Sequence, residues 1–538
     1  MLAEKRVGIF MGDEEKKLNV ALVRGPVVFG AGSINNEATP AIGFAYISGY
    51  LRSKGYDAII VDSIGEGLNV IWPFKKYPGF YCQGLPFDAV IARIPKDTDV
   101  IGFSGMFSGE WPVLRDLIIK IKNHFPHALF VIGGEHVSAL PEYSLRDCPA
   151  LDCCIMGEGE HTFYSLLETY KGKGKIQGVY GIAYIDDNDN FIQDCTKPPR
   201  IGNIDEIPWP DWPEGYLEKF WAAEKSFGIS SKRDMPFMFS RGCPFQCTFC
   251  SSPIMWTSRY KLRNISDVIK EVRHYIERYN ITSIQLYDLT AIVKKDWIIQ
   301  FCKRVLSEGI KLNWTFPSGT RSEVLNKETL KLLKQIGCNY LVYAPESGSP
   351  NTLKLIKKRI NLNRITDSVL EGKRQGLTIR TNLIIGFPGE SWNDIFKTLM
   401  YGLKMSIKGV DEVPVFIFSP YPGTEISQDL IDKGEIALND DYFFSLTSLN
   451  GTYLSTKVVS YNLKTNARLL GICRLIFNLA NYAIGYSLRP NRILRTFRNL
   501  SSNEASTVFE HRLKNMLRRK NFDKPEEMIN QNVPNKVG

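Results

Sequence analysis

The feature that most constrains the fold is an alternation of short β-rich runs with helical stretches, which occurs twice along the chain. The first run extends from residue 18 to residue 163. Strands that alternate with helices form a parallel, doubly wound sheet, and such a sheet binds its ligands beyond the carboxyl ends of its strands. The predicted strands of this run span residues 20–23, 58–61, 100–104, 129–132 and 153–156.

A Pro-rich stretch at residues 204–215, IDEIPWPDWPEG, precedes the second run. Its X-Pro steps disfavour helix, so we expect a semi-rigid linker. The second run continues to about residue 424, and its six strand-and-helix units predict an incomplete, TIM-like (β/α) barrel with its active site at the carboxyl ends of the strands. The predicted barrel strands span residues 237–240, 283–287, 312–316, 340–344, 380–385 and 415–418.

These patterns place the chain in the α/β class. Its composition, 44% hydrophobic and 23% charged residues, excludes an intrinsically disordered protein. The predicted organisation is an N-terminal tail at 1–17, a flavodoxin-like doubly wound domain at 18–200, a linker at 201–235, a partial (β/α)6 barrel at 236–430 and a helical, basic C-terminal region at 431–538.

The cellular setting follows from what the sequence lacks. The apolar segment 465–486 is interrupted by Arg474, Asn478 and Asn481, so we do not expect a membrane span. The amino terminus has no long apolar run, so we do not expect export. Eleven cysteines without the spacing of a small disulfide scaffold fit reduced thiols in the cytoplasm. A net charge of +10 over 538 residues is mild and does not indicate a nucleic-acid partner.

The most specific motif is SRGCPFQCTFCSSP, which places Cys243, Cys247 and Cys250 in a C-x3-C-x2-C spacing just after a predicted strand. Three thiolates this close can converge on one metal centre if the segment is a loop, which Gly242 and Pro244 favour. A zinc site needs a fourth ligand, and no other Cys or His lies nearby. A [4Fe–4S] cluster accepts three protein ligands when a cofactor binds the fourth iron. The motif therefore predicts such a cluster, with zinc or three buried structural thiols as the alternatives.

This spacing, with the aromatic Phe249 before the third cysteine, resembles the radical S-adenosylmethionine (SAM) superfamily. SGTRSEVL (318–325), APESGS (344–349), LIIGFPGES (383–391) and SPYPGTEI (419–426) extend the resemblance across the barrel. In that superfamily the open iron chelates the methionyl group of SAM, and reductive cleavage releases a 5′-deoxyadenosyl radical. The resemblance adds Phe249, Arg321, Glu346, Gly386, Gly389 and Glu390 as SAM-site residues. By it, Arg321 and Glu346 contact the nucleoside or methionyl part, and residues 386–390 shape the adenine pocket.

Two of these roles have plain structural alternatives, and one family feature is missing. Glu346 could cap a helix, and residues 386–389 could form only a tight turn. The family's Gly-Gly-Glu after the second barrel strand is replaced by YDLT (287–290), which leaves the contact to the amino group of SAM without a candidate.

The first domain resembles the cobalamin-binding domains fused to one branch of this superfamily. The matching pieces are residues 40–63, IGFSGM (101–106), VIGGEH (131–136) and IMGEGEHTF (155–163). The resemblance implies bound cobalamin, with Ser104, Gly133, Gly134, Gly157 and Gly159 as the residues of its site.

The cobalt is expected to have no histidine ligand. The Asp-x-His-x-x-Gly motif of carriers that use one is absent, and DSIGEG (62–67) has Ile64 at the histidine position. No histidine precedes His124, so the lower face of the cobalt is expected to be water-bound or empty. We expect His136, the one imidazole near the predicted site, to be a solvated loop residue or a contact to the nucleotide tail.

Within this branch the chain is most similar to the group of C- and P-methylases, hopanoid methylases and the anaerobic magnesium-protoporphyrin monomethyl ester cyclase. The resemblance implies a cobalamin-dependent radical SAM methyltransferase that acts on an unactivated carbon or phosphorus. The alternatives are radical oxidation or cyclisation without methyl transfer, and a non-enzymatic cobalamin sensor. A tRNA methylthiotransferase needs a second trio of cysteines near the amino terminus, and no cysteine precedes Cys82.

The partners implied are a small-molecule or natural-product substrate and a flavodoxin or ferredoxin as electron donor. No catalytic side chain is identified. The segment YSLRPNRIL (486–494) resembles a C-terminal piece of the same branch. We therefore expect the C-terminal region to close the barrel and cover the substrate, with its arginines solvated, rather than to bind RNA or rest on a membrane.

Overall fold

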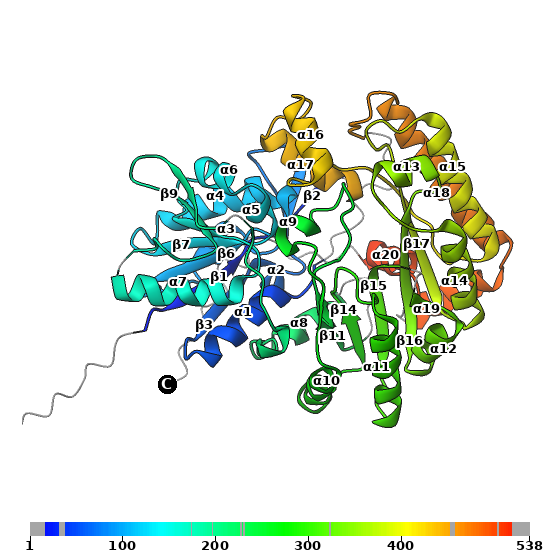
Figure 1. Ribbon diagram of the computed structural model, residues 1–538, viewed down its shortest axis with the longest axis horizontal. Coiled ribbons are helices and arrows are strands. Elements are labelled where there is room, and N and C mark those ends of the chain that lie inside the picture. The colour runs from blue at the N-terminus through cyan, green and yellow to red at the C-terminus, as the bar shows by residue number, and fades with distance from the viewer. Residues whose placement is uncertain are drawn as a thin grey trace, which may run out of the picture.

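The computed structural model describes residues 17–31, 38–173, 175–195, 197–225, 229, 232–321, 324–451, 458–502 and 505–518. Two α/β units lie side by side, and helices from the C-terminal region bridge them along one edge (Figure 1). The predicted α/β class, with a doubly wound domain followed by a barrel and a helical extension, is confirmed.

The N-terminal unit is a seven-stranded sheet with the order β10-β9-β8-β7-β6-β1-β3. The five strands from β8 to β3 are parallel, β9 runs antiparallel to β8, and β10 runs antiparallel to β9. The bounds are β1 Val20–Arg24, β3 Ala58–Asp62, β6 Val100–Ser104, β7 Leu129–Gly133, β8 Cys153–Ile155, β9 Ile182–Ile185 and β10 Phe191–Gln193. The chain passes from β1 to β3 and then crosses back to β6, so β1 and β6 flank the switch point at which doubly wound sheets bind ligands.

Helices cover both faces of this sheet. Side chains alternate along each strand, so Val20 and Leu22 pack under α1 (Ile42–Ser53) and α7 (Gly159–Lys173), whereas Ala21 and Val23 face the other way. The opposite layer contains α3 (Phe87–Ile91), α4 (Trp111–Lys122), α5 (Glu135–Ala139) and α6 (Pro141–Asp147). Burial on both faces explains why these strands are continuous apolar runs that the sequence reveals clearly.

The second unit is a six-stranded parallel sheet in chain order, which forms the predicted partial barrel. Its strands are β11 Asp234–Phe237, β14 Ser283–Leu286, β15 Asn313–Thr320, β16 Cys338–Glu346, β17 Thr378–Ile385 and β18 Val415–Ile417. The helices between them are α10 Ile265–Tyr279, α11 Lys295–Ser307, α12 Lys327–Gln335, α13 Pro350–Leu355, α14 Leu362–Arg374 and α15 Trp392–Lys408. The predicted first strand, 237–240, starts too late, because β11 begins at Asp234.

Several short strands are not evident in the sequence. A three-stranded antiparallel sheet contains β2 (Val27–Gly30), β5 (Phe80–Gln83) and β4 (Ile71–Pro73). A second small ladder pairs β12 (Ser240–Arg241) with β13 (Lys261–Leu262). Two to four residues are too few to show an alternating pattern, so these strands are set by tertiary contacts. The β12–β13 pair matters for the site, because it brackets the cysteine loop.

The C-terminal region contributes α16 (Glu425–Asp432), α17 (Asp440–Gly451), α18 (Ala467–Ser487), α19 (Asn491–Ser502) and α20 (Val508–Arg518). Helix α17 lies on the N-terminal unit, where Phe444 packs against Tyr77 and Phe80 with ring centroids 4.4 and 4.5 Å apart. Helix α18 packs against α15 and β18. By length and composition α18 could also cross a membrane. Its most apolar 18-residue stretch has a mean hydropathy of 1.3, and 39% of that stretch is buried.

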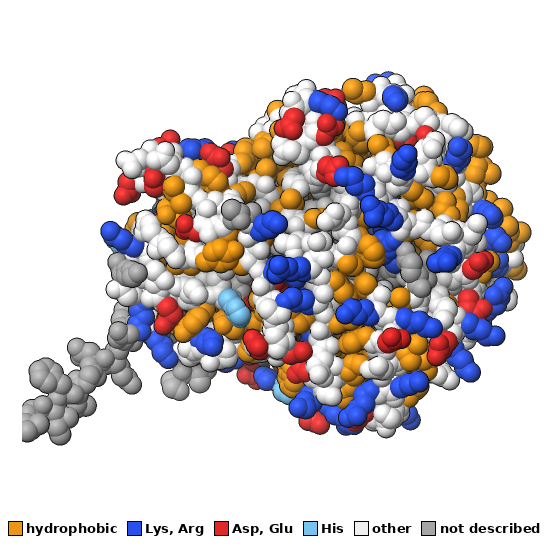
Figure 2. Space-filling model, viewed as in Figure 1, with side chains coloured by type: hydrophobic (Ala, Val, Ile, Leu, Met, Phe, Trp, Pro, Cys, Tyr) orange, Lys and Arg blue, Asp and Glu red, His pale blue; other side chains and the backbone are white. Residues whose placement is uncertain are grey.

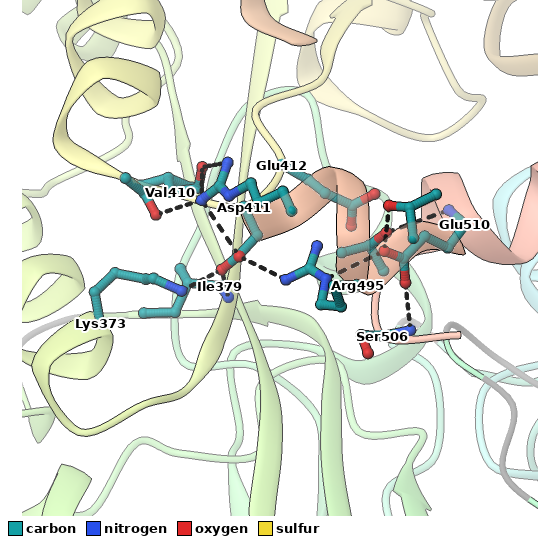
Figure 3. Close-up of polar contacts among 12 residues, drawn as sticks. Lys373, Ile379, Val410, Asp411, Glu412, Arg495, Ser506 and Glu510 are labelled. Atoms are coloured by element: carbon teal, nitrogen blue, oxygen red, sulfur yellow. Dashed lines mark hydrogen bonds and ion pairs between the residues drawn. The ribbon is translucent and has the colours of Figure 1, made fainter. Parts of the chain in front are cut away.

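Helices α19 and α20 close the barrel at the amino ends of its strands (Figure 3). Asp411, which precedes β18, accepts from Arg492 and Arg495 at 3.4 Å and lies beside Lys373. The carboxylate of Glu412 accepts from the first two amides of α20, those of Val508 and Phe509.

Two predictions for this region are wrong. Arg492 is buried rather than solvated, because it donates to the carbonyls of Gly409 and Val410, and Arg474 of α18 is buried as well. Helices α19 and α20 also lie at the opposite end from the cysteine loop, so they do not cover the site. Within residues 458–502, the contact with the site's edge comes from the start of this segment: Asn462 donates to the carbonyl of Glu390, and Leu470 packs on Gly386.

Candidate functional site

The three predicted cluster cysteines lie on a loop between β12 and α9 (Ser252–Trp256). Gly242 starts the loop with φ +85°, and a Cβ there would lie 2.3 Å from the carbonyl oxygen of Arg259. Only glycine therefore fits the point where the chain turns out of β12. Cys243, Cys247 and Cys250 are unpaired and partly exposed.

Burial and two nearby cations act in opposite directions on two of the three thiols of this loop. Burial raises the pKa of each thiol, that of Cys250 to about 12, and the neighbouring thiols raise it further at Cys247 and Cys250. Lys358 and Arg321 act in the opposite direction on the pKa of Cys243 and Cys247. The side chains thus provide three soft ligands with two cations beside them, which offset the negative charge of a thiolate-bound cluster.

The donor set fits an iron–sulfur cluster better than a single ion. Among the described residues, no three or more Cys, His, Asp or Glu side chains lie close enough together to hold one metal ion. A zinc site needs four ligands on one ion, and the loop supplies three cysteines. A [4Fe–4S] cluster is less demanding, because each cysteine binds a different iron. The third alternative, three buried structural thiols, is not favoured because all three cysteines are partly exposed.

Glu346 and Arg321 both lie near the cysteine loop. Glu346 ends β16 with φ +66°, and its carboxylate pairs with Lys358 at 3.0 Å. Ser349, not Glu346, caps α13, so the helix-cap interpretation of Glu346 is wrong. The Arg321 guanidinium lies 3.6 Å from the centre of the Phe245 ring, inside the cysteine loop.

Lys358 is a site residue that the sequence did not single out. Burial lowers its pKa, but Glu346 and Cys247 outweigh burial, so the net pKa is raised and the amine stays charged. It lies in the run Lys357–Lys358–Arg359, which as a sequence is typical of a solvated basic surface. The signal that could have found it is its position twelve residues after Glu346, on the connection that follows α13. The same connection lines a groove of about 650 Å³, with Lys354, Lys357 and Arg359 beside Lys358.

The predicted adenine-pocket segment is a turn that its own carboxylate closes. Glu390 accepts from the amides of Gly386 and Phe387 at 2.7 and 3.2 Å, and from the Thr352 hydroxyl at 2.9 Å. Burial raises the pKa of Glu390 to about 7. Gly386 and Gly389 both have positive φ. Glu390 can therefore shape an adjacent pocket by holding the turn in place, since its carboxylate already accepts hydrogen bonds from that turn.

Phe249 connects this turn to the cysteine loop. Its ring lies 5.6 Å from that of Phe387 in an edge-on arrangement, and Phe387 in turn packs against Phe418 at 5.0 Å. The three rings form an apolar floor between the cysteine loop, the turn after β17 and the end of β18.

Asp288, in the YDLT segment, is a structural residue. It is fully buried and accepts from the amides of Phe239 and Ser240 and from the Ser240 hydroxyl. Burial raises its pKa to about 6. Asp288 therefore holds the segment that leads into β12 and the cysteine loop, and it is not free to contact the amino group of SAM.

The five residues predicted for cobalamin share the carboxyl edge of the N-terminal sheet. Ser104 and Gly133 are register partners at the ends of β6 and β7. Gly134 has φ +123°, and a Cβ there would lie 2.6 Å from the carbonyl of Gly105. Gly157 donates to Ser138 at 3.0 Å and packs on Pro198, and Gly159 begins α7.

The glutamates of the GEGE segment bind the barrel. Arg241, the last residue of β12, pairs with Glu158 at 3.1 Å and Glu160 at 2.6 Å, and Arg200 pairs with Glu158 at 2.7 Å. All four side chains are buried. Glu135 accepts from the hydroxyl of Ser251, which follows Cys250. The carboxyl edge of the sheet and the cysteine loop are therefore in direct contact.

His136 corrects one prediction. It is 1% exposed, not solvated, because its ring stacks on Trp111 at 4.7 Å and meets Phe443 of α17 edge-on. Its Nδ1 lies 3.0 Å from the Ser108 hydroxyl. Burial lowers the pKa of His136 to about 3, so the imidazole is neutral at physiological pH.

Comparison with known proteins identifies the family of each unit. The Radical SAM superfamily model matches residues 237–401, and the B12 binding domain model matches residues 36–167. An uncharacterised methyltransferase of Pyrococcus horikoshii is 29% identical over 414 residues, 76% of this chain and 83% of that protein. The cytidylyl-2-hydroxyethylphosphonate methyltransferase of Streptomyces wedmorensis is 28% identical over 430 residues, 74% and 79% of the two chains. The anaerobic magnesium-protoporphyrin IX monomethyl ester cyclase of Rubrivivax gelatinosus is 24% identical over 412 residues, 75% and 69%.

The fold also matches a solved structure. The cobalamin-dependent SAM radical enzyme OxsB, determined with aqua-cobalamin and SAM bound, superposes with a TM-score of 0.60 and 20% sequence identity. The match covers 85% of this chain and 60% of OxsB, so the chain spans about three fifths of that protein's length. At this identity the likeness concerns the fold.

Proposed function

The chain is a radical SAM enzyme with an N-terminal B12-binding domain, and from that premise we propose that it is a methyltransferase that acts on an unactivated carbon or phosphorus of a small molecule. Its cofactors are a [4Fe–4S] cluster, SAM and cobalamin. When bound, these supply a 5′-deoxyadenosyl radical that removes hydrogen from the substrate and a methyl group for the resulting substrate radical.

The observation that carries the proposal is the contact between the two cofactor-binding edges. Arg241 joins the strand before the cysteine loop to Glu158 and Glu160 of the N-terminal unit, and Ser251 joins the loop to Glu135. A radical formed at one edge is thus generated next to the edge that holds the methyl carrier. Two relatives that match most of the chain are named methyltransferases, which supports methyl transfer as the reaction.

The residues of this chain have distinct proposed tasks. Cys243, Cys247 and Cys250 hold the cluster. Glu346, Lys358 and Arg321 form a charged group beside it that orients the zwitterionic end of SAM, while Phe249 and the 386–390 turn shape the adenine pocket. Ser104, Gly133, Gly134, Gly157 and Gly159 leave room for the cobalamin tail at the sheet edge, because glycine permits close backbone approach.

The cobalt is proposed to lack a histidine ligand. His136 is 1% exposed and its ring is packed between Trp111 and Phe443, so the imidazole is enclosed by protein side chains. Electron paramagnetic resonance spectra of the Cob(II) form should therefore show no superhyperfine splitting from an imidazole nitrogen. Splitting that disappears in His136→Phe would contradict this.

The test of methyl transfer uses SAM with an isotopically labelled methyl group. The anaerobically reconstituted enzyme is incubated with a low-potential reductant, or with the flavodoxin or ferredoxin that we propose as donor, and with small-molecule extract from a host that expresses it. Labelled product together with 5′-deoxyadenosine supports the proposal. Unlabelled, oxidised or cyclised product with 5′-deoxyadenosine would favour the second candidate, which the similarity to the cyclase of Rubrivivax gelatinosus supports. Cobalamin binding without SAM cleavage would indicate a sensor.

The setting of the reaction is also proposed. An oxygen-sensitive cluster and a low-potential donor place the enzyme in a reducing cytoplasm. No nucleic-acid partner is proposed, because a net charge of +10 over 538 residues is mild and the buried Arg492 pairs with Asp411 within the fold.

A further inference from the structure

Helix α18 has its polar and apolar sides reversed relative to an ordinary surface helix. Its polar residues Arg474, Asn478 and Asn481 are buried against the barrel. Asn478 accepts from the backbone amide of Val415, and Asn481 accepts from the hydroxyl of Ser406. A water-exposed helix normally presents such residues outward and its apolar stripe to the core. Of the apolar residues of α18, Leu470 and Phe477 are buried, whereas Leu469, Ile472, Ile476 and Leu479 remain on the outside.

The outward apolar residues of α18 continue onto its neighbour α15. The two helices run in the same direction and in register, since a Cβ on Gly402 would contact Phe477 and Arg489 donates to the Ile407 carbonyl. We call their outer surface the α15–α18 face. Its side chains, each 39–61% exposed, are Phe396, Met400, Ile407, Leu469, Ile472, Ile476 and Leu479. Figure 2 shows apolar side chains along the right edge of the molecule, where Figure 1 places these helices.

The charged side chains that α15 and α18 expose are all cationic. Helix α15 carries three lysines, Lys397, Lys404 and Lys408, and its one acidic residue, Asp394, is buried. Between Tyr442 and Asn503 the chain has eight Lys and Arg and no Asp or Glu, although Arg474 and Arg492 are buried. Arg468 is exposed at the start of α18. An apolar surface of several large side chains on two helices whose exposed charges are cationic matches the interface of an anionic bilayer, in which basic residues meet headgroups and apolar residues enter the acyl boundary.

We propose that the α15–α18 face binds peripherally to an anionic lipid bilayer, with α15 and α18 lying along the membrane surface. A second copy of this chain is a poorer occupant, because a twofold contact through this face would bring the same cationic side chains together. A transmembrane role for α18 is also disfavoured, since its three buried polar side chains bind the barrel. From the sequence, barrel closure is expected instead of membrane contact. In the structure the polar side of α18 packs on the barrel, and its exposed apolar side is available for membrane contact.

The test is flotation of the full-length, anaerobically purified holoenzyme with vesicles. We expect the enzyme to float with vesicles of phosphatidylcholine mixed with phosphatidylglycerol and not with vesicles of phosphatidylcholine alone. High salt should release it from the anionic vesicles. Ile476→Glu combined with Leu479→Glu should reduce binding to the anionic vesicles by roughly tenfold or more, because two apolar contacts are replaced by charges of the wrong sign. Lys404→Glu should reduce it by several fold.

Matched controls lie on another outer helix of the barrel. Leu306→Glu and Lys303→Glu change an exposed apolar and an exposed basic residue of α11, and they should leave flotation unchanged. Because all these positions are exposed, thermal unfolding of every variant should match the parent protein. Absence of flotation with anionic vesicles, equal flotation with neutral vesicles, or equal loss in the α11 variants would overturn the proposal. A concentration-dependent dimer that the α18 variants abolish, without vesicle binding, would also overturn it and assign the face to self-association.

Discussion

Lys358 shows how much a single side chain contributes to the site. Its amine is nearly buried and pairs with the equally buried carboxylate of Glu346, beside Cys247. Lys358→Met should destabilise the apoprotein by about 3 kcal/mol, because it leaves the charge of Glu346 buried and unpaired. The free energy of unfolding in urea measures this.

The adjacent residue provides the control. Lys357 pairs with Glu425 at the surface, where both side chains are more than half exposed. Lys357→Met should cost less than about 1 kcal/mol. Equal, small effects of the two substitutions would show that Lys358 is not part of a buried charge pair.

His136 predicts a pH dependence of stability. Its pKa in the folded protein is about 3, below the ordinary value of 6.5, so the unfolded chain binds the proton more tightly. Its contribution to stability is therefore complete above pH 6.5 and is lost progressively as the pH falls from 6.5 toward 3. Between pH 7 and pH 5 this loss amounts to about 2 kcal/mol. Denaturation at both pH values should show that the parent protein loses about 2 kcal/mol more stability than His136→Phe, which keeps the stacking on Trp111 and the opposing contributions of Glu390 and Asp288.

His124 is the matched control, because it is exposed and its substitution by Phe should preserve the loss between pH 7 and pH 5. A His136→Phe variant with the same pH dependence as the parent would contradict the buried, neutral imidazole. Burial of His136 was not evident from the sequence, since the ring is enclosed by Trp111 and by Phe443, more than 300 residues away. Contacts this distant along the chain leave no local pattern.

At the scale of elements, the cysteine loop depends on the turn out of β12. Gly242→Ala would place a Cβ against the Arg259 carbonyl in a backbone conformation that favours glycine. We expect the loop to shift and the protein to lose most of its iron and acid-labile sulfide after anaerobic reconstitution.

Gly434→Ala separates loop geometry from general strain. Gly434 has φ +71°, yet a Cβ there would meet nothing within 4 Å. This substitution should cost about 1 kcal/mol and leave the iron content unchanged. Full iron content in Gly242→Ala would indicate that the turn does not position the cysteines.

The elements that the sequence predicted well are those with a strong local pattern. The five parallel strands of the first unit and five of the six barrel strands lie where their apolar runs predict them. The strands β2, β4, β5, β12 and β13 were missed because each has only two to four residues, and β4 ends in Pro73. The cysteine spacing predicts three metal ligands, but Lys358 and Asp288 were missed because their partners lie in other segments.

At the scale of the whole molecule, a buried charge network joins the two units. Arg241→Met would leave Glu160 without its cation and Glu158 with Arg200 alone. We expect a loss of about 3–5 kcal/mol and faster proteolysis within the 204–215 linker. In addition, cleavage of SAM should persist while methyl transfer to product falls, because the two edges no longer align.

Arg146→Met tests whether the loss of any ion-paired arginine lowers stability as Arg241→Met is expected to do. Arg146 pairs with Glu142 and Asp189 at the surface of the first unit, and its loss should change stability by less than about 1 kcal/mol. Equal decreases of SAM cleavage and methyl transfer in Arg241→Met would contradict the proposed alignment of two edges.

The most direct test of the account is the formation of 5′-deoxyadenosine by anaerobic protein supplied with iron, sulfide, SAM and a strong reductant. The parent protein and Cys473→Ala, which alters a cysteine of α18 outside the loop, should both form it. The variant in which Cys243, Cys247 and Cys250 are all replaced by Ala should form none. Failure of the parent protein to cleave SAM, or cleavage that survives in the triple variant, would contradict the central claim.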